Sequence, residues 1–367
     1  MKVPDKKITE VLFSLLRLSA GGRENDFPVL TAQEWQEVYN IAVQHSVLGV
    51  VFGGIEKLPN EKWPDKIMSM KFYAQVKYIR SFSEQAASSS LSSVKRFTRE
   101  GRRSVILKGI SSAALYEAPE LRSSGDVDIW PEGDRKWIIA FCRNINPASR
   151  VYYHHIPLAK VNGVEVEVHI TPTWMNNPFS NIRLQRWFRD FWKDGSNICM
   201  VPCAGEEVPV MSPSYNRVFM LIHIFRHLFT DGVGMRQLMD YYYLLRQGAP
   251  AEEKLRIMAF LKTLNLAGFA SAVMYVLQEV FRLPEDCMLT APDKKRGAFL
   301  LDEILRSGNF GQYDDRITGD NGASPAYNFF ARTTRSLRFL TQYPSETIWL
   351  PFFKIWHFIY RKIYKSV

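Results

Sequence analysis

Strand-like patterning in this sequence lies between Ser104 and Ile170, and helix-like patterning flanks it on both sides. The run SVILKG, Ser104–Gly109, is short, apolar and ended by glycine, which predicts a buried strand. The segments DVDIW (Asp126–Trp130) and VEVEVHI (Val164–Ile170) alternate polar and apolar residues, the period of a strand with two different faces. A further strand is expected at VYYHHI, and short helices at Ser111–Ala118 and Arg135–Cys142. These segments predict a small mixed β-sheet of the α+β class, flanked by helical regions.

The flanking regions show apolar positions at helical spacing, together with residues that start helices. Before the sheet, helices are expected over about Lys7–Leu18, from Thr31 through EWQEVYNIAVQHSVL, and over about Asp65–Arg99. Thr31 and Glu34 have the spacing of a capping box. After the sheet, Ser212 and Pro213 are a typical N-cap and first helical residue. Further helices are expected near Met235–Arg246, Ala251–Thr263, Ala267–Phe281, Lys294–Ser307 and Pro325–Gln342.

The length of 367 residues allows two or three domains. We expect an N-terminal helical region (1–103), an α/β core (104–211) and a C-terminal helical region (212–367). The net charge of +10 favours partners such as nucleotides, nucleic acid or anionic lipid, although a solvated basic surface is an equal alternative. Nucleic acid remains a candidate without support from a motif.

The N-terminal segment, the lack of a long apolar stretch and the cysteines together indicate the cellular compartment. Asp5 and Glu10 interrupt the short apolar N-terminal run, which argues against a signal peptide. No stretch reaches the length of charge-free apolar sequence that a spanning helix needs. The four cysteines, two of them in CMVPC, lack the second ligand pair of a zinc finger, so free thiols are expected. A cytoplasmic protein is therefore predicted.

The segment DVDIW carries the residues that most directly indicate chemistry. On a strand alternate side chains share a face, so Asp126 and Asp128 point the same way while Val127 and Ile129 point into the core. Two neighbouring carboxylates repel, and burying them is costly unless a cation lies between them. Mg²⁺ is the expected cation, because it prefers oxygen ligands and keeps positions open for phosphate oxygens, and Mn²⁺ could replace it.

The second alternating segment can complete this site. In VEVEVHI one face carries Glu165, Glu167 and His169. If this strand lies beside DVDIW, a third carboxylate joins Asp126 and Asp128, and three such acids can hold two metal ions for in-line nucleotidyl transfer. Each pattern alone is common on solvated strands, and the inference rests on their order along the chain.

Positive charge and backbone freedom occur just upstream. Lys108 and Gly109 end the first strand, and Ser111 opens the next helix. A glycine lets backbone approach a phosphate, and helix N-terminal amides favour anions. Lys108 and Arg122 could add charge that binds a triphosphate.

The stretch LKGISSAALYEAPELRSSGDVDIW, followed by VEVEVHI and by LIHIFRHLFTDGVGMRQLMDYYYLL, resembles a bacterial family of uncharacterised nucleotidyltransferases in the polymerase-β-like superfamily. Its Lys-Gly, Arg, DxD and acid-x-His elements match Lys108-Gly109, Arg122, Asp126/Asp128 and Glu167/His169. The resemblance implies that Glu167, and not Glu165, is the third acid. It also implies nucleotide contacts from His169, and it allows them from His227, Arg236 and Asp240. Gly109 is followed by Ile110, where the superfamily usually has a second Gly or Ser, and the gap to Asp126 is longer than usual.

Two other features allow more than one interpretation. His223 and His227 are spaced to chelate a metal, but HIFRH lacks the Glu of a hydrolase zinc helix, and packed histidines are the better interpretation. The tail IWLPFFKIWHFIYRKIYKSV mixes aromatic and basic residues. It could dock on the body of the protein, which is favoured, or lie on an anionic membrane surface.

The sequence therefore predicts an Mg²⁺-dependent nucleotidyltransferase that moves a nucleoside monophosphate from an NTP to an acceptor hydroxyl. Asp126, Asp128 and Glu167 are the predicted catalytic and metal-binding residues. The acceptor could be a protein side chain, a small molecule, a sugar or RNA. The alternative is a catalytically inactive nucleotide-binding or interaction protein that keeps the fold, which the irregular glycine motif favours.

Overall fold

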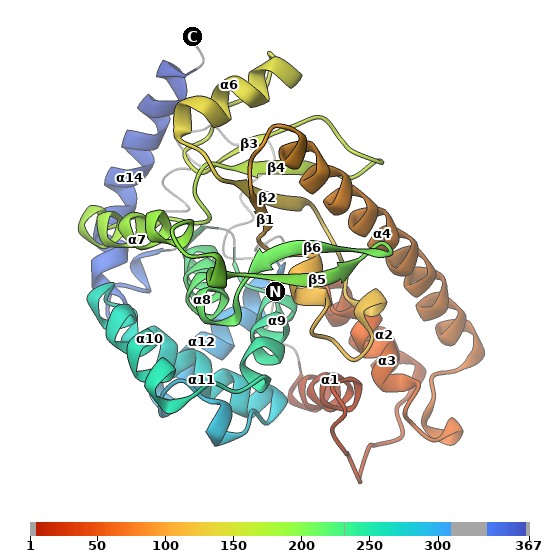
Figure 1. Cartoon of the computed structure of the whole chain (residues 1–367). Helices are drawn as coiled ribbons and strands as arrows, with labels where there is room; N and C mark the ends of the chain where they lie inside the picture. Colours follow the sequence, from red (N-terminus) through yellow and green to blue (C-terminus); the bar gives the residue numbers. More distant parts are fainter. Residues whose placement is uncertain (1–4, 231, 310–335, 365–367) are drawn as a thin grey trace.

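The computed structural model describes residues 5–230, 232–309 and 336–364, and Figure 1 shows a mixed sheet with helices on both of its faces. The strands are β1 (Ser104–Ile106), β2 (Val127–Pro131), β3 (His155–Pro157), β4 (Val166–His169), β5 (Ile198–Cys203) and β6 (Glu206–Met211). Their order across the sheet is β3-β4-β2-β1-β6-β5. The pairs β2–β4 and β1–β6 are parallel, and the other pairs are antiparallel. The predicted α+β class with a mixed sheet is confirmed.

The N-terminal helices are α1 (Lys6–Ser19), α2 (Ala32–Gln44), α3 (Leu48–Ile55) and α4 (Lys66–Arg99). Thr31 and Glu34 form the predicted capping box of α2. The expected continuation of this helix to Leu48 is wrong, because Ser46 has a left-handed backbone (φ 57°) that ends the helix before α3 begins. Every residue of α3 is buried.

The later helices are α5 (Ile110–Ala113), α6 (Arg135–Ile145), α7 (Pro178–Phe191), α8 (Pro213–Thr230), α9 (Met235–Arg246), α10 (Ala251–Thr263), α11 (Ala267–Phe281), α12 (Lys294–Ser307) and α14 (Pro344–Ile363). Short 3₁₀ turns occupy η1 (Asn60–Lys62), η2 (Pro119–Leu121), η3 (Gly195–Asn197) and η4 (Glu285–Cys287). The helix expected near Pro325–Gln342 lies mostly outside the described residues. None of the described helices is both long and apolar enough to cross a bilayer.

The sheet is larger than the sequence patterning indicated. The expectation that the chain is helical after Ile170 is wrong, because β5 and β6 form a hairpin that joins the sheet. Ala204 and Gly205 both have positive φ in the connecting turn, which suits the twist of a two-residue hairpin. Pro202 and Pro209 obscure the strand pattern in this segment, since proline is unusual within strands. The predicted helix over Ser111–Ala118 is also shorter, ending at Ala113.

The two faces of the sheet pack against different layers. Val127, Ile129 and their neighbours on β4 contact α4 and α6 in one apolar cluster. Trp130 points to the opposite face, where it packs against Phe188 and Phe191 of α7. Asp128, between Ile129 and Val127, points to that same opposite face, as the alternation predicted. The carboxylates therefore lie on the side of the sheet that α8 and α9 cover (Figure 1).

A close helix contact supports the loop that precedes the carboxylates. A Cβ at Gly49 of α3 would lie 2.2 Å from the carbonyl oxygen of Leu121. Glycine is therefore required for α3 to approach this backbone, and the contact holds the loop that carries Arg122.

Candidate active site

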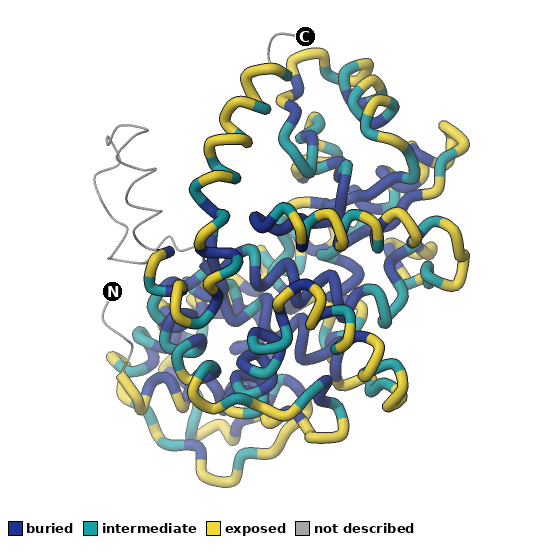
Figure 2. Tube along the Cα trace, turned by 90° about the vertical axis from the view of Figure 1, so that its left-hand side faces the viewer, coloured by how far each residue is buried: buried dark blue, intermediate teal, exposed yellow. Residues whose placement is uncertain are grey.

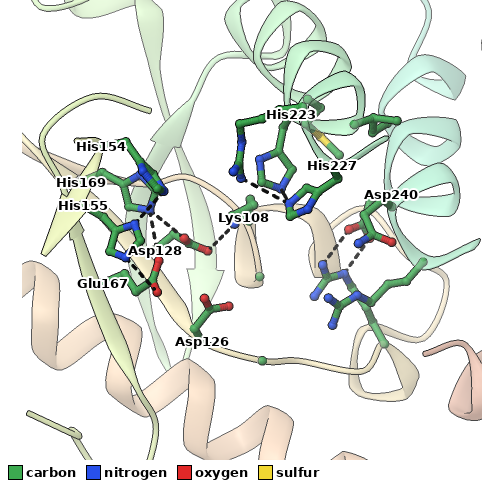
Figure 3. A pocket seen from close by; sticks show the side chains of 18 residues that line it. Lys108, Asp126, Asp128, His154, His155, Glu167, His169, His223, His227 and Asp240 are labelled. Atoms are coloured by element: carbon green, nitrogen blue, oxygen red, sulfur yellow. Dashed lines mark hydrogen bonds and ion pairs between the residues drawn. The ribbon is translucent and has the colours of Figure 1, made fainter. Parts of the chain in front are cut away.

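A cavity of about 320 Å³ opens between the sheet and helices α8 and α9 (Figure 3). The predicted site residues that line it are Lys108, Gly109, Arg122, Asp126, Asp128, Glu167, His169, His227, Arg236 and Asp240. Ser111 does not line it, because this side chain is buried and donates to the carbonyl oxygen of Leu107 (3.3 Å). Residues from β2, β4, α8, α9 and the loops after β1 thus meet at one place.

Asp128 and Glu167 are direct partners in the parallel pairing of β2 with β4. His169 lies two residues further along β4 and on the same face. Ligand atoms of these three side chains all lie within 4.8 Å of one another, so the group could hold a metal ion. The parallel register brings the two acids together, since residues paired in adjacent strands project the same way.

Asp128 is almost fully buried and has two partners at opposite carboxylate oxygens. Lys108 Nζ lies 3.0 Å from Oδ2, and His169 Nε2 lies 2.8 Å from Oδ1. Burial alone would raise the pKa of Asp128, but the Lys108 charge and the His169 hydrogen bond outweigh it and hold the pKa well below its usual range. Asp128 is therefore an ionised acid in the folded protein.

Glu167 is in the opposite electrostatic situation. Burial, together with the charges of Asp128 and Asp126, raises the pKa of Glu167 to about 8. His155 Nε2 lies 3.4 Å from its Oε1, but burial lowers the pKa of His155 to about 3, so this imidazole is neutral and gives little compensation. A bound cation would remove the conflict by neutralising both carboxylates.

Asp126 lies one residue before β2 and is solvent-exposed at the rim of the cavity. Figure 3 shows its carboxylate apart from Asp128 and Glu167, and it is not part of the group whose ligand atoms lie within 4.8 Å. The charge of Asp128 and partial desolvation raise its pKa. The structure thus places Asp126 at the cavity. The side chain that joins Asp128 and Glu167 in the compact group is His169, and Asp126 is not part of that group.

Arg122 and Asp240 form an ion pair in the cavity wall that lies opposite Asp128 and Glu167. The guanidinium donates to both carboxylate oxygens at 2.7 Å, and Tyr116 donates its hydroxyl to the same carboxylate at 2.7 Å. All three side chains are buried. Arg236 Nη1 lies nearby and donates to the carbonyl oxygen of Ser123 (3.0 Å). Asp240 therefore fixes the position of Arg122, and Arg236 fixes the loop before Asp126.

The backbone at Lys108 and Gly109 bends sharply into the site. Gly109 has φ 63° and ψ −107°, a combination that side chains with a Cβ rarely adopt. A residue with a side chain would be strained there, so the glycine predicted to face a phosphate also has a conformational requirement.

His223 and His227 project from α8 toward the cavity (Figure 3) with their Nε2 atoms 3.0 Å apart. Burial lowers the pKa of both well below the usual range, so both are neutral. Within the described ranges, the cluster of three side chains that could hold a metal is the Asp128 group, and it contains neither of these histidines. His223 and His227 are thus two neutral histidines that hydrogen-bond to each other in the wall of the cavity. This agrees with the prediction that they are packed histidines and not zinc ligands.

Three histidine or arginine side chains that line the cavity were not predicted from the sequence. His154 and His155 belong to the segment VYYHHI, for which the pattern predicts a strand but no role in the site. Arg226 lies between the two histidines of α8. His155 pairs with His169 across the antiparallel β3–β4 ladder, and the Arg226 guanidinium lies 4.2 Å from the Trp174 ring centre. A His pair opposite an acid-x-His strand is the signal that could have indicated them.

The fold and this site define a nucleotidyltransferase-like protein. Residues 31–282 match the family described as uncharacterised nucleotidyltransferase, and the chain belongs to that family. It is also similar to the crystal structure of an antigenic nucleotidyltransferase-like protein from Paracoccidioides brasiliensis, with 14% identity, a TM-score of 0.35, and coverage of 58% of this chain and 95% of that one. No curated protein matches the chain. Family membership supports a general role in nucleotidyl transfer and implies a nucleotide substrate.

Proposed function

We propose that the protein transfers a nucleoside monophosphate from an NTP to an acceptor hydroxyl and releases pyrophosphate, with Mg²⁺ or Mn²⁺ as cofactor. The observation that carries the proposal is the direct pairing of Asp128 with Glu167 in a cavity whose other walls hold Lys108, Arg122 and Arg236. Negative and positive walls facing one cavity suit a nucleoside triphosphate together with a cation. Catalysis would then come mostly from positioning and charge neutralisation.

The donor set fits a divalent cation of this kind. The carboxylate oxygens of Asp128 and Glu167 are ligands that suit Mg²⁺ and Mn²⁺. Asp128 and Glu167 would hold the ion, with Asp126 available from the rim for a second ion. Bound there, such ions would neutralise phosphate charge and favour the ionised acceptor hydroxyl.

The surrounding residues have roles that follow from their contacts. His169 orients the Asp128 carboxylate through the 2.8 Å hydrogen bond, as groups behind metal ligands commonly do. Lys108 can exchange its contact with Asp128 for a contact with a phosphate oxygen, since part of its side chain faces solvent. Glu167 could accept the proton of the acceptor hydroxyl. Arg122 shapes the far wall, where Asp240 keeps it in place.

The function is tested with each of the four NTPs labelled at the α-phosphate, in cell extract supplemented with Mg²⁺ or Mn²⁺. Wild-type protein is expected to label an acceptor and to release pyrophosphate, and Glu167→Gln is expected to lose at least about 100-fold in rate, because an acid needed at the metal is gone. Glu165→Gln is the matched control, since Glu165 is solvent-exposed and immediately precedes β4. Equal labelling by wild type and Glu167→Gln would contradict the proposed role of Glu167.

A second candidate function is nucleotide binding without transfer. Two observations favour binding without transfer. Asp126 is separate from the Asp128–Glu167–His169 group, and Ile110 follows Gly109 where the glycine motif usually has a second Gly or Ser. Cation-dependent NTP binding without label transfer to any acceptor would support this candidate over the enzyme.

The contribution of Glu167 to the stability of the metal-free protein is expected to fall as the pH rises from about 4.5 to about 8. Glu167 has a pKa of about 8 when folded and an ordinary value of 4.5, so the folded state holds more protons than the unfolded state between these values. Glu167→Gln removes this effect and should raise the melting temperature by a few degrees at about pH 9 in EDTA. Glu165→Gln should leave the pH profile unchanged. Superimposable profiles of wild type and Glu167→Gln would show that Glu167 has no raised pKa.

A further inference from the structure

The C-terminal helix α14 docks one face on the body of the protein. Its N-terminal end is held by Glu346, whose carboxylate accepts hydrogen bonds from the backbone amides of Asn176 and Asn177. Further along, Phe353 stacks on Trp174 with ring centres 5.9 Å apart. Near its end, Tyr360 accepts a hydrogen bond from Arg135. The favoured prediction that the tail docks its aromatic residues is therefore confirmed for this face.

A second face of α14 is apolar and exposed. The residues that form this apolar stripe are each more than half exposed: Ile348, Phe352, Ile355, Ile359 and Ile363. Their spacing of three or four places them on one side of the helix, as the period of 3.6 requires. Trp356 extends the stripe along one edge and Phe358 along the other. In Figure 2 the helix below the C-terminus is mostly exposed on its outer side.

A basic cavity of about 560 Å³ adjoins the Phe358 edge of this stripe. Four basic side chains line it: Arg143, Arg150, Arg361 and Lys362. No acidic residue is among the described residues that line it, and it shares no lining residue with the candidate active site. Arg143 donates to the carbonyl oxygen of Tyr364 (2.9 Å), which ties the cavity to the end of α14. An anion is therefore the ligand that this cavity suits.

We propose that the apolar stripe and the basic cavity form one docking surface for an anionic membrane. The helix would lie in the plane of the interface, with Ile355 and Ile359 entering the acyl boundary, and the cavity would bind the phosphate of a lipid headgroup. A surface with apolar residues beside clustered basic residues has the two properties that peripheral binding to anionic lipid requires. The apolar stripe gives no advantage for binding a free phosphate or a polynucleotide, and the basic cavity gives none for burial against an apolar protein.

The test uses the full-length protein and sedimentation with vesicles of phosphatidylcholine alone or with about a quarter phosphatidylglycerol. Binding is expected with the anionic vesicles and not with the neutral ones. Arg361→Ala/Lys362→Ala should lower the partition coefficient about tenfold or more, since each basic residue near an anionic surface contributes about fivefold. Ile355→Ser/Ile359→Ser should lower it by about tenfold or more as well, since it removes apolar side chains that would enter the acyl boundary. Circular dichroism checks that both variants fold.

Matched controls come from the exposed side of α4. Ile67→Ser/Met70→Ser removes two exposed apolar residues, and Lys66→Ala/Lys77→Ala removes the same charge as the cavity variant. Both controls should bind the anionic vesicles within about twofold of wild type. If the α4 variants lose binding as strongly as the α14 variants, net charge and general hydrophobicity explain the binding, and the docking surface is refuted.

Other results would identify a different occupant and overturn the proposal. The cavity would be a site for a soluble anion if the wild-type protein does not bind anionic vesicles but binds inorganic phosphate, and if Arg361→Ala/Lys362→Ala loses the phosphate binding. Wild-type protein that ignores vesicles and forms a dimer in light scattering, dissociated by Ile355→Ser/Ile359→Ser, would make a second copy the occupant of the stripe.

Discussion

Replacing Asp128 with asparagine is expected to weaken Mg²⁺-dependent NTP binding by about 100-fold or more. Asp128 is the buried, ionised member of the pair with Glu167, and its carboxylate belongs to the group that could hold a cation. Asparagine keeps the shape but removes the charge and one acceptor oxygen, and losing even a group behind a metal ligand commonly costs roughly 10- to 100-fold in affinity. Titration calorimetry with each NTP, with Mg²⁺ and with EDTA, measures the effect.

The fold of this variant needs its own measurement, because Asp128 also contacts Lys108 and His169. Circular dichroism and the melting temperature establish whether Asp128→Asn is folded. Glu165→Gln, which removes an exposed acid from the segment that leads into β4, should bind NTP like wild type. Unchanged NTP affinity in a folded Asp128→Asn protein would remove the metal site from the mechanism.

Breaking the Arg122–Asp240 pair is expected to be the most destabilising change in the site. Asp240→Asn leaves a buried guanidinium without its carboxylate, and Arg122→Met leaves a buried carboxylate with Tyr116 as its remaining donor. Removing one partner of a buried ion pair costs about 3–5 kcal/mol. Each single variant should therefore lower stability by about that amount in denaturant unfolding.

The double variant Arg122→Met/Asp240→Asn distinguishes a true pair from two independent residues. With both charges removed, neither buried ion is left unpaired, so the double variant should be more stable than the sum of the single losses predicts, by about 1–3 kcal/mol. The amide that replaces the Asp240 carboxylate can still accept a hydrogen bond from Tyr116. Additive losses would show that Arg122 and Asp240 stabilise the protein independently.

The arrangement of the carboxylates could be predicted because it depends on local alternation. Asp128 faces away from Val127 and Ile129, and Glu167 faces away from Val166 and Val168, as the period of two requires. The helices α1, α4 and α9 to α12 likewise begin and end near the predicted positions, and α8 begins at the predicted Pro213, since each has its own cap or apolar periodicity. These features need only residues that are close in sequence.

The hairpin of β5 and β6 could not be predicted in this way. β6 joins the sheet through its pairing of Val210 with Ile106, a contact between residues far apart in the chain. The end of α2 depends on Ser46 adopting a left-handed backbone, which α3 makes favourable by burying all of its residues. In both cases packing overrides a weak or misleading local signal.

The order of amino acids is enough to establish which side chains each strand presents to its two faces, because that property follows from the geometry of one extended segment. Three features of the site come instead from the folded arrangement of distant segments. His169 lies nearer to Asp128 and Glu167 than Asp126 does, Asp240 holds Arg122, and two further histidines line the same cavity. The physical reason is that strand order, register and helix docking minimise the free energy of the whole chain, and no local pattern contains those distant contacts.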